Sequence, residues 1–304
     1  MASAKTLVCV VGPTAVGKTA VGIPLAQHFQ TAILSADSRQ FYREMTIGTA
    51  KPSDDELAAA PHHFINSHHI TEDYSAGDFE RDALALLEKL FLHHDVVILV
   101  GGSGLFVRAV CQGLDDLPKA LPGVRDRLNT LYREQGLEPL QRLLQQVDPA
   151  YFDDMDNQNP QRVIRALEVY ESTGTPFSHL RHGQAAERPF DVVNIGLDTD
   201  RELLYQRINS RVDAMMAAGL LNEVESLLPH REKPPLKTVG YAELFDYLDG
   251  KCTLEDAVDK IKQNTRRYAK RQLTWFRKDK TTVWFAPDDI AGMIAYISSR
   301  ISLQ

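Results

Sequence analysis

The clearest chemical signal in the sequence is a glycine-rich segment near the N-terminus that ends in lysine and threonine. It is a complete G-x-x-x-x-G-K-T pattern. Glycines in this pattern let backbone amides surround phosphate oxygens, the lysine neutralises their charge, and the threonine hydroxyl can hold Mg²⁺. A ligand-free tight turn would leave Lys18 and Thr19 unexplained. We therefore expect a diphosphate or triphosphate, with Mg²⁺ on Thr19, to contact Gly12, Thr14, Ala15, Val16, Gly17, Lys18 and Thr19.

A second candidate is an aspartate that follows the next predicted strand, a short run at residues 32–35. Asp37 comes directly after this run. Ligands of open α/β sheets bind at the carboxyl ends of the strands, so Asp37 is expected beside the glycine-rich loop, where it could take a proton from a nucleophile. An aspartate that caps the following turn fits the position equally well.

The segment after the apolar run at residues 96–100 lacks the carboxylate of a hydrolase. It continues as Gly101-Gly102-Ser103, whereas ATPases and GTPases normally carry an aspartate at the end of such a strand to organise Mg²⁺. A site that holds a diphosphate without this group suits a reaction in which pyrophosphate leaves. Such a site must stabilise the charge on the leaving group and align a nucleophile, as in alkyl transfer from an allylic diphosphate.

Alternating strands and helices are predicted to position these residues. Apolar runs typical of doubly buried strands alternate with helical periodicity in the first third of the chain and again in the last third. Predicted strands cover residues 7–11, 32–35, 96–100, 192–197 and 282–285, and predicted core helices cover 18–28, 76–91, 201–218, 223–228, 239–249 and 254–277. Thr253 and Asp256 form a capping-box pattern at the start of the last helix.

The middle of the chain has a different sequence pattern. Amphipathic helices are predicted at 122–135, 137–147 and 161–172, and no strand is predicted between them. Gly, Pro and Asp-Asn residues, which favour turns, separate the helices. We therefore predict an α/β fold, a P-loop NTPase-like parallel sheet flanked by helices with an inserted all-helical subdomain. The predicted segments are a first part of the core at 1–117, the insertion at 118–189 and a second part of the core at 190–304.

Further motifs follow the glycine-rich loop in a fixed order. They are Ala36-Asp37-Ser38-x-Gln40-x-Tyr42, Ile47-Gly48-Thr49-Ala50-Lys51-Pro52, Gly101-Gly102-Ser103-Gly-Leu105-Phe106, Asn159-Pro160-Gln161-Arg162, Val239-Gly240-Tyr241 and Arg267-Tyr268-Ala269-Lys270-Arg271-Gln272-Leu273-Thr274-Trp275. The set resembles the tRNA dimethylallyltransferases and spans residues 12–275. A glycine-rich loop alone is shared by many families, whereas the ordered set is specific.

The resemblance implies a reaction and roles for single residues. The donor would be dimethylallyl diphosphate, the acceptor N6 of the adenosine directly 3′ of the anticodon, and the cofactor Mg²⁺. Asp37 resembles the general base, Ser103 would hydrogen-bond the adenine or the leaving oxygen, and Arg211 would hold the pyrophosphate. On spacing alone, Arg207 and Arg211 fit an exposed pair that forms salt bridges with Glu202 or Asp213.

The resemblance also implies contacts with the tRNA anticodon stem-loop. The implied residues are Asp37, Ser38, Arg39 and Gln40, then Gln161, Arg162, Val163, Ile164 and Arg165, then Lys237, Thr238, Val239, Gly240, Tyr241 and Ala242. The target base must leave its stack to react, and Arg39 and Phe41 are candidates to stack against it.

The last predicted helix carries a basic stripe. Residues 260–280 contain nine Lys and Arg side chains and one acidic residue, Asp279. Arg267, Lys270 and Arg271 within it could follow an RNA backbone along one helix face, although a solvated helix face explains the charge equally well.

One motif departs from the family. Its members usually carry Thr, and Tyr three residues later, where this chain has Ser103 and Phe106. Ser103 keeps the hydroxyl, whereas Phe106 cannot donate the hydrogen bond of a tyrosine.

Composition restricts the function class. The net charge is −7 and the three cysteines are far apart without C-x-x-C spacing, so neither indiscriminate nucleic-acid binding nor a disulfide framework is indicated. No apolar run of 18 residues or leader pattern is present, and we expect a cytoplasmic, membrane-free monomer. A P-loop small-molecule kinase and a nucleotide-binding regulatory module are the alternatives, and a requirement for ATP would favour the kinase.

Overall fold

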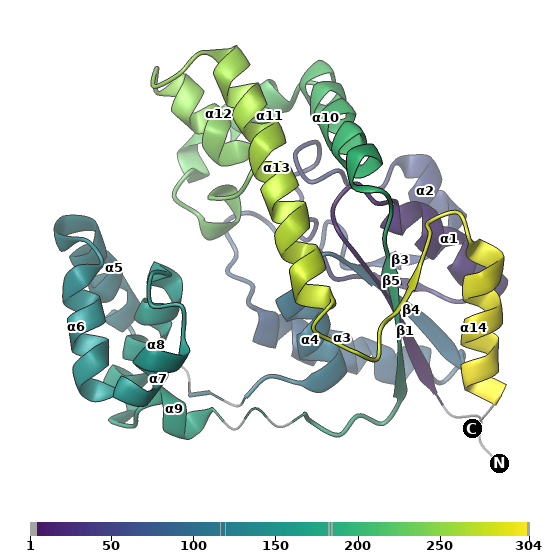
Figure 1. Cartoon of the computed structure of the whole chain (residues 1–304), viewed down its shortest axis with the longest axis horizontal. Helices are drawn as coiled ribbons and strands as arrows, with labels where there is room; N and C mark the ends of the chain where they lie inside the picture. Colours follow the sequence, from purple (N-terminus) through teal and green to yellow (C-terminus); the bar gives the residue numbers. More distant parts are fainter. Residues whose placement is uncertain (1–4, 116, 119, 182, 184, 303–304) are drawn as a thin grey trace. The chain divides into compact units, whose positions relative to one another are not determined.

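The computed structural model describes residues 5–115, 117–118, 120–181, 183 and 185–302. Residues 1–4, which belong to the N-terminal segment predicted to have no leader pattern, lie outside this part of the chain. The larger of two compact units comprises residues 1–112 and 187–304 and contains a parallel sheet (Figure 1). Its six strands lie in the order β3-β2-β4-β1-β5-β6. The strands are β1 (Thr6–Val11), β2 (Ile33–Ser35), β3 (His62–His63), β4 (Val96–Gly101), β5 (Asp191–Leu197) and β6 (Val283–Phe285). The predicted α/β class with a parallel, P-loop-like sheet is confirmed.

The central strand β1 separates two hydrophobic cores. Leu7, Cys9 and Val11 belong to one core, and Val8 and Val10 belong to the other. Successive side chains of a strand point to opposite faces of its sheet, so a strand that is covered on both faces needs an unbroken apolar run. This requirement explains why the strand was recognisable in the sequence.

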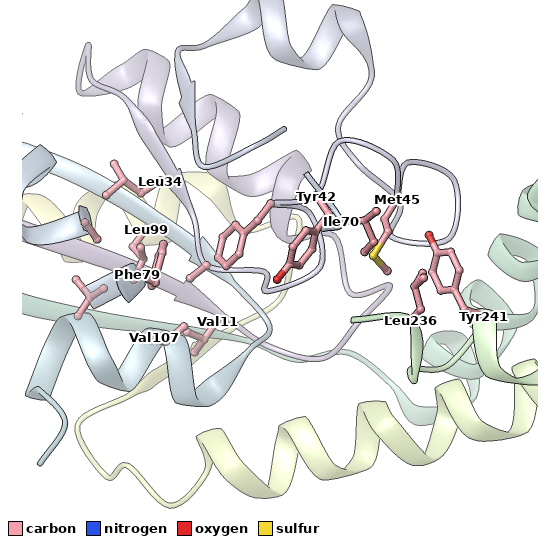
Figure 2. Close-up of a cluster of buried hydrophobic side chains, with 14 of the residues drawn as sticks. Val11, Leu34, Tyr42, Met45, Ile70, Phe79, Leu99, Val107, Leu236 and Tyr241 are labelled. Atoms are coloured by element: carbon pink, nitrogen blue, oxygen red, sulfur yellow. The ribbon is translucent and has the colours of Figure 1, made fainter. Parts of the chain in front are cut away.

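Helices cover both faces of the sheet. The core that contains Val11 and Leu99 extends to Met45, Leu236 and Tyr241, as Figure 2 shows. The helices that contribute to it include α3 (Ala76–Leu90), α4 (Gly104–Gln112), α11 (Leu220–Ser226), α12 (Tyr241–Leu248) and α13 (Leu254–Phe276). The opposite core is covered chiefly by α1 (Lys18–His28), α10 (Arg201–Ala217) and α14 (Ile290–Ser302).

The second compact unit comprises residues 113–186 and is helical wherever its described residues form regular structure. It has its own core, in which Leu128, Leu140, Leu144 and Leu167 are fully buried. The predicted limits of this insertion are 118 and 189. Its helices are α5 (Val124–Gln135), α6 (Glu138–Val147), α7 (Pro149–Asp154), α8 (Pro160–Thr173) and α9 (Phe177–Leu180).

Most predicted helices agree with the structure to within two residues at either end. The exception is α11, which begins at Leu220 rather than at 223 because Gly219, in a left-handed conformation, directly precedes it. The capping box of Thr253 and Asp256 is present at the start of α13. Elements absent from the prediction are β3, α2 (Asp54–Ala59), α4, α7, α9, α14, and two 3₁₀ turns at Leu228–His230 and Pro234–Leu236.

In the part of the chain that is described, no helix combines the length and the apolar character needed to cross a membrane.

Candidate active site

The topology brings three loops to one edge of the sheet. Strands β1, β2 and β4 are parallel, and β4 pairs with both of the others. The carboxyl ends of the three strands therefore lie together. The N–H of Ala36 donates to Val100 O (2.8 Å), and a Cβ on Gly101 would lie 2.7 Å from Ala36 O. This close approach requires glycine and places the segment after β2 beside the segment after β4.

The glycine-rich loop joins β1 to α1 and includes left-handed backbone at a glycine and at an alanine. Gly17 has φ +109°, and Ala15 is held at φ +65°. Left-handed backbone is natural for glycine and costly for alanine. The Lys18 ammonium donates to the loop's own carbonyl oxygens, Gly12 O (3.1 Å) and Pro13 O (2.8 Å). The loop is thus ordered around its lysine.

Burial alters the ionisation of Lys18. Removal of the ammonium from water lowers the pKa of Lys18 to about 8, the nearby Asp37 carboxylate opposes this shift, and Arg211 and Arg39 add to it. A cation that is poorly solvated and surrounded by other cations gains most from a bound anion. The site is therefore electrostatically prepared for phosphate groups.

Asp37 lies in the loop that follows β2. Its Oδ1 accepts the N–H of Arg39 (3.1 Å) and lies 3.8 Å from Arg39 Nε. The Asp37 side chain retains 22% exposure, so part of the carboxylate remains accessible. The structure contains both arrangements considered from the sequence, because Asp37 accepts a local turn hydrogen bond and also faces the cavity.

Ser103 lies behind this segment rather than in the wall of the cavity. Its Oγ accepts the N–H of Ser38 (3.1 Å) and lies 3.1 Å from Ser38 Oγ. Ser103 thus supports the segment after β2.

Both ends of the Gln40 amide form hydrogen bonds within the protein. Ser35 Oγ donates to its Oε1 (3.1 Å), while its Nε2 donates to Thr49 O and Ala50 O (both 3.2 Å). Lys51, in the next stretch of chain, donates to Tyr42 O (2.5 Å) and Asn66 Oδ1 (2.6 Å). These contacts make Gln40 a support of the cavity wall, with little capacity left to bind a ligand.

A single cavity of about 280 Å³ connects these groups. Its cationic side chains come from four separate segments and its carboxylates from two, while one face of α13 supplies a further part of the wall. The cations are Lys18, Arg39, Lys51 and Arg211, the carboxylates are Asp37 and Glu56, and α13 contributes Ile261, Thr265, Tyr268 and Gln272. The excess of cations suits a polyanion, and Asp37 supplies a proton acceptor beside it.

Arg211 reaches this cavity from α10. It lines the cavity with Lys18 and Thr19 and makes no hydrogen bond or ion pair to another described residue. Asp213, a partner considered for it, instead pairs with Lys262 (2.6 Å). Arg207 is directed to the outside of the glycine-rich loop, where its Nη1 donates to Val16 O (3.4 Å). Arg211 is therefore available to a ligand.

Comparison with known proteins identifies the family. The IPP transferase family matches residues 40–279. A tRNA dimethylallyltransferase from Christiangramia forsetii is 51% identical over 297 residues, which cover 97% of this chain and 98% of the relative. This chain belongs to the IPP transferase family. It is accordingly an enzyme of the prenyltransferase class.

Solved structures agree with this assignment. The full-length tRNA isopentenylpyrophosphate transferase from Bacillus halodurans is 37% identical, with a TM-score of 0.73 and coverage of 98% of this chain and 97% of that chain. The tRNA isopentenylpyrophosphate transferase from Staphylococcus epidermidis is 31% identical, with a TM-score of 0.70 and coverage of 99% and 100%. The fold of this IPP transferase family member is thus shared along the whole chain.

Phe106, one of the two departures from the usual family motif, is packed among other aromatic rings. Phe106 packs against Phe41 and Phe79, with ring centroids 5.6 Å apart in each case. Phe41 is itself fully buried. Phe41 therefore cannot stack on a target base, which corrects the expectation from sequence, and Phe106 contributes to the core. Of the two stacking candidates only Arg39 remains.

In the helical unit, burial divides the predicted tRNA-contacting residues of α8. Val163 and Ile164 are fully buried in the core of the unit, because they occupy the apolar face of an amphipathic helix. Gln161 and Arg162 are exposed, and Arg165 donates to the buried Glu168 (2.8 Å). Only the three polar side chains remain candidates for direct contact with RNA.

The segment at residues 237–242 divides in the same way. Tyr241 is fully buried and donates to Glu223 Oε1 (2.7 Å), so its side chain has no surface for RNA. Val239 and Gly240 line the cavity. Lys237 pairs with Glu232 (2.8 Å) at the surface, Thr238 Oγ1 donates to Pro235 O (2.9 Å), and Ala242 is half-buried at the start of α12.

Several side chains of the basic stripe on α13 are already paired with other residues. Lys262 pairs with Asp213, Arg266 donates to Asn209 Oδ1 (2.6 Å), and Arg277 pairs with Asp198 (2.5 Å). Arg267, Lys270 and Arg271 are exposed, and the Arg271 guanidinium lies 5.8 Å from the centre of the Tyr268 ring. Lys260, Lys278 and Lys280 of the stripe are exposed as well. We call Arg267, Lys270 and Arg271 the α13 basic face.

Sequence reasoning missed residues that shape the site through distant contacts. Tyr268 places its ring under the Arg39 guanidinium at 5.5 Å, Glu223 supports the segment that carries Gly48, and Gln272 contacts the glycine-rich loop. The spacing of Tyr268 and Gln272 is i, i+4, which places both on one helix face and was the available signal.

Proposed function

We propose that this enzyme transfers a dimethylallyl group from dimethylallyl diphosphate to N6 of the adenosine directly 3′ of the anticodon in tRNA. The bond from C1 of the allyl group to the diphosphate oxygen breaks, and its electron pair leaves with diphosphate. A bond forms between N6 and C1, and N6 gives up one proton. The products are N6-dimethylallyladenosine in the tRNA and diphosphate.

One observation carries this proposal. A proton acceptor, Asp37, and the diphosphate-type cradle of Lys18 line the same cavity, and their charges interact. The names of the relatives, tRNA dimethylallyltransferase and tRNA isopentenylpyrophosphate transferase, indicate an allylic diphosphate and tRNA as the two substrates. The 3′-adjacent adenosine as the acceptor rests on the motif resemblance given above.

The division of work between the side chains follows from their positions. Lys18, Arg211 and the loop amides neutralise the charge that grows on the departing diphosphate. Asp37 accepts the N6 proton as the new bond forms. Arg39 presents its guanidinium plane toward the cavity and over Tyr268, which suits stacking on a base that has left the helix.

Mg²⁺ fits the oxygen groups of the cavity. Thr19, Asp37 and Glu56 line it, and hydroxyl, carboxylate and phosphate oxygens are the ligands that Mg²⁺ prefers. In the described part of the chain, no cluster of three His, Cys, Asp or Glu side chains could hold a metal by itself. The ion would therefore be bound together with the diphosphate, with Thr19 as its protein ligand, and would supply Lewis-acid stabilisation of the leaving group.

The tRNA would be held through its backbone. The α13 basic face supplies exposed cations suited to phosphates, and Gln161, Arg162 and Arg165 supply polar contacts from the helical unit. We propose that the enzyme acts as a monomer in the cytoplasm, together with its tRNA substrate.

A transfer assay tests the proposal. Purified protein is incubated with Mg²⁺, unmodified tRNA and dimethylallyl diphosphate labelled in the allyl group, with and without ATP, and the nucleosides are analysed. We expect labelled N6-dimethylallyladenosine in both reactions. A product that requires ATP, or a phosphorylated small molecule without labelled nucleoside, would instead assign the glycine-rich loop to a kinase.

A further inference from the structure

Gln272 joins two of the three loops at the active edge of the sheet. Its Oε1 accepts the N–H of Thr14 in the glycine-rich loop (2.8 Å), and its Nε2 donates to Gly102 O after β4 (2.8 Å). The side chain is 6% exposed, although it lies on α13, more than 150 residues along the chain from both partners. Each end of one amide thus satisfies a backbone group of a different loop.

The fit around this amide is tight. A Cβ on Gly102 would lie 2.5 Å from Gln272 Nε2 and 3.4 Å from Lys18 Nζ. Gly102, Lys18 and Gln272 therefore meet at one point in the cavity wall. Only a side chain of this length that both donates and accepts a hydrogen bond can satisfy the two loops at once.

The same helix has two faces with different surroundings. Ile261, Thr265, Tyr268 and Gln272 line the cavity, whereas Arg267, Lys270 and Arg271 are exposed. The exposed face is the part proposed to bind tRNA. The buried face, through Gln272, contacts the part proposed to bind the donor.

We propose that Gln272 is a positioning residue of the donor site. It fixes the first turn of the glycine-rich loop against the carboxyl end of β4, so that the amides of residues 15 and 17–19 and the Lys18 ammonium converge on the diphosphate. The Thr14 N–H is already used by Gln272 and is not a phosphate ligand. This inference rests on the proposed function, because it assumes that the cavity binds a diphosphate.

Removal of the amide should weaken the donor site and leave the tRNA surface intact. In Gln272→Leu, the Thr14 N–H and Gly102 O lose their buried partners and the loop can leave its binding geometry. We expect the affinity for inorganic diphosphate with Mg²⁺, measured by calorimetry without tRNA, to fall about tenfold or more. Affinity for tRNA should stay within about twofold of the wild type, which distinguishes positioning from a general loss of folding.

A matched control lies on the same helix. Gln263 is exposed on α13 and does not line this cavity, so Gln263→Leu makes the same chemical change without touching the loops. Its diphosphate affinity should remain within about twofold of the wild type. An equal loss in Gln263→Leu and Gln272→Leu would overturn the proposal, since the effect would then come from the helix as a whole.

A conservative variant gives a second, pH-dependent readout. In Gln272→Glu, the ionised carboxylate can accept from Thr14 but cannot donate to Gly102 O, and it repels the diphosphate. The protonated acid can do both. The diphosphate affinity of this variant, taken as a ratio to the wild type at each pH, should therefore recover as the pH falls toward the pKa of the new carboxyl group.

The diphosphate site and the role of Gln272 are tested separately. Wild-type protein that binds no diphosphate would remove the proposed donor site, and this inference with it. Wild-type protein that binds diphosphate, with Gln272→Leu and Gln272→Glu binding it equally well at every pH, would overturn only the role of Gln272.

Discussion

The Tyr241 hydroxyl donates a hydrogen bond to Glu223 Oε1 at 2.7 Å, beneath the segment that forms one wall of the cavity. The same carboxylate accepts the backbone N–H groups of Thr46 (3.0 Å), Ile47 (2.7 Å) and Gly48 (3.0 Å). A Cβ on Gly48 would lie 2.7 Å from the Tyr241 ring. One carboxylate from α11 therefore fixes the start of the cavity-lining segment at residues 48–51.

Loss of this carboxylate should destabilise the protein. Glu223→Ala leaves three backbone donors and a buried phenol without their acceptor, and we expect the free energy of unfolding to fall by about 2–3 kcal/mol in urea denaturation. Glu225→Ala is the matched control, because Glu225 is exposed on the same helix and should change stability by less than about 0.5 kcal/mol. Equal losses in the two variants would show that Glu223 has no special role.

Asp37 should be needed for transfer and not for RNA binding. Asp37→Asn keeps the size of the side chain and its capacity to accept a hydrogen bond from Arg39, but it cannot take the N6 proton. We expect the single-turnover rate to fall about 10²-fold or more, while the Kd for tRNA stays within about twofold of the wild type. Wild-type rates in this variant would remove the role of Asp37 as the base.

The pKa of Lys18 predicts a pH dependence for donor capture. Burial lowers the pKa of Lys18 to about 8 in the free enzyme, so the ammonium is present below that pH and is lost above it. We expect kcat/KM for dimethylallyl diphosphate to decline as the pH rises above about 8, because this ratio reports groups of the free enzyme.

Lys18→Arg is the control for this profile. Arginine stays charged throughout the range, so its profile should be flat above pH 8 even if its rate is lower. A decline that persists unchanged in Lys18→Arg would assign the titration to another group.

The α13 basic face should contribute to tRNA affinity in a salt-dependent way. Replacement of Arg267, Lys270 and Arg271 by Gln should weaken binding and reduce the slope of log Kd against log salt concentration, since each phosphate contact releases counterions. Lys89→Gln, an exposed change on α3, removes one positive charge away from this face and should leave the slope unchanged. An unchanged slope in the triple variant would show that tRNA binds elsewhere.

Local patterns in the sequence predicted the elements that position the site. The buried strand at 7–11 and the helix that starts at Lys18 have signals within a few residues, and both lie where they were expected. Helix α4 was not predicted because it starts at Gly104, within a glycine-rich segment that is typical of turns. Its stability comes from buried contacts of Val107, Ala109 and Val110.

Contacts between distant residues could not be predicted in this way. Gln272 is 258 positions from Thr14 along the chain, so no periodicity connects them. The motif that contains Tyr241 suggested a ligand contact, whereas the side chain packs in the core against Gly48. A motif shows that a residue type is required at a position, but burial decides whether it serves the ligand or the fold.

The most direct test of the central claim uses two anticodon stem-loop RNAs that differ only at the base 3′ of the anticodon. One carries adenosine, and the other carries purine riboside, which lacks the exocyclic N6. With labelled dimethylallyl diphosphate, Mg²⁺ and no ATP, the account predicts label in the first RNA and none in the second. Label in both RNAs, or in neither, would contradict attack by N6 on an allylic diphosphate held by the glycine-rich loop.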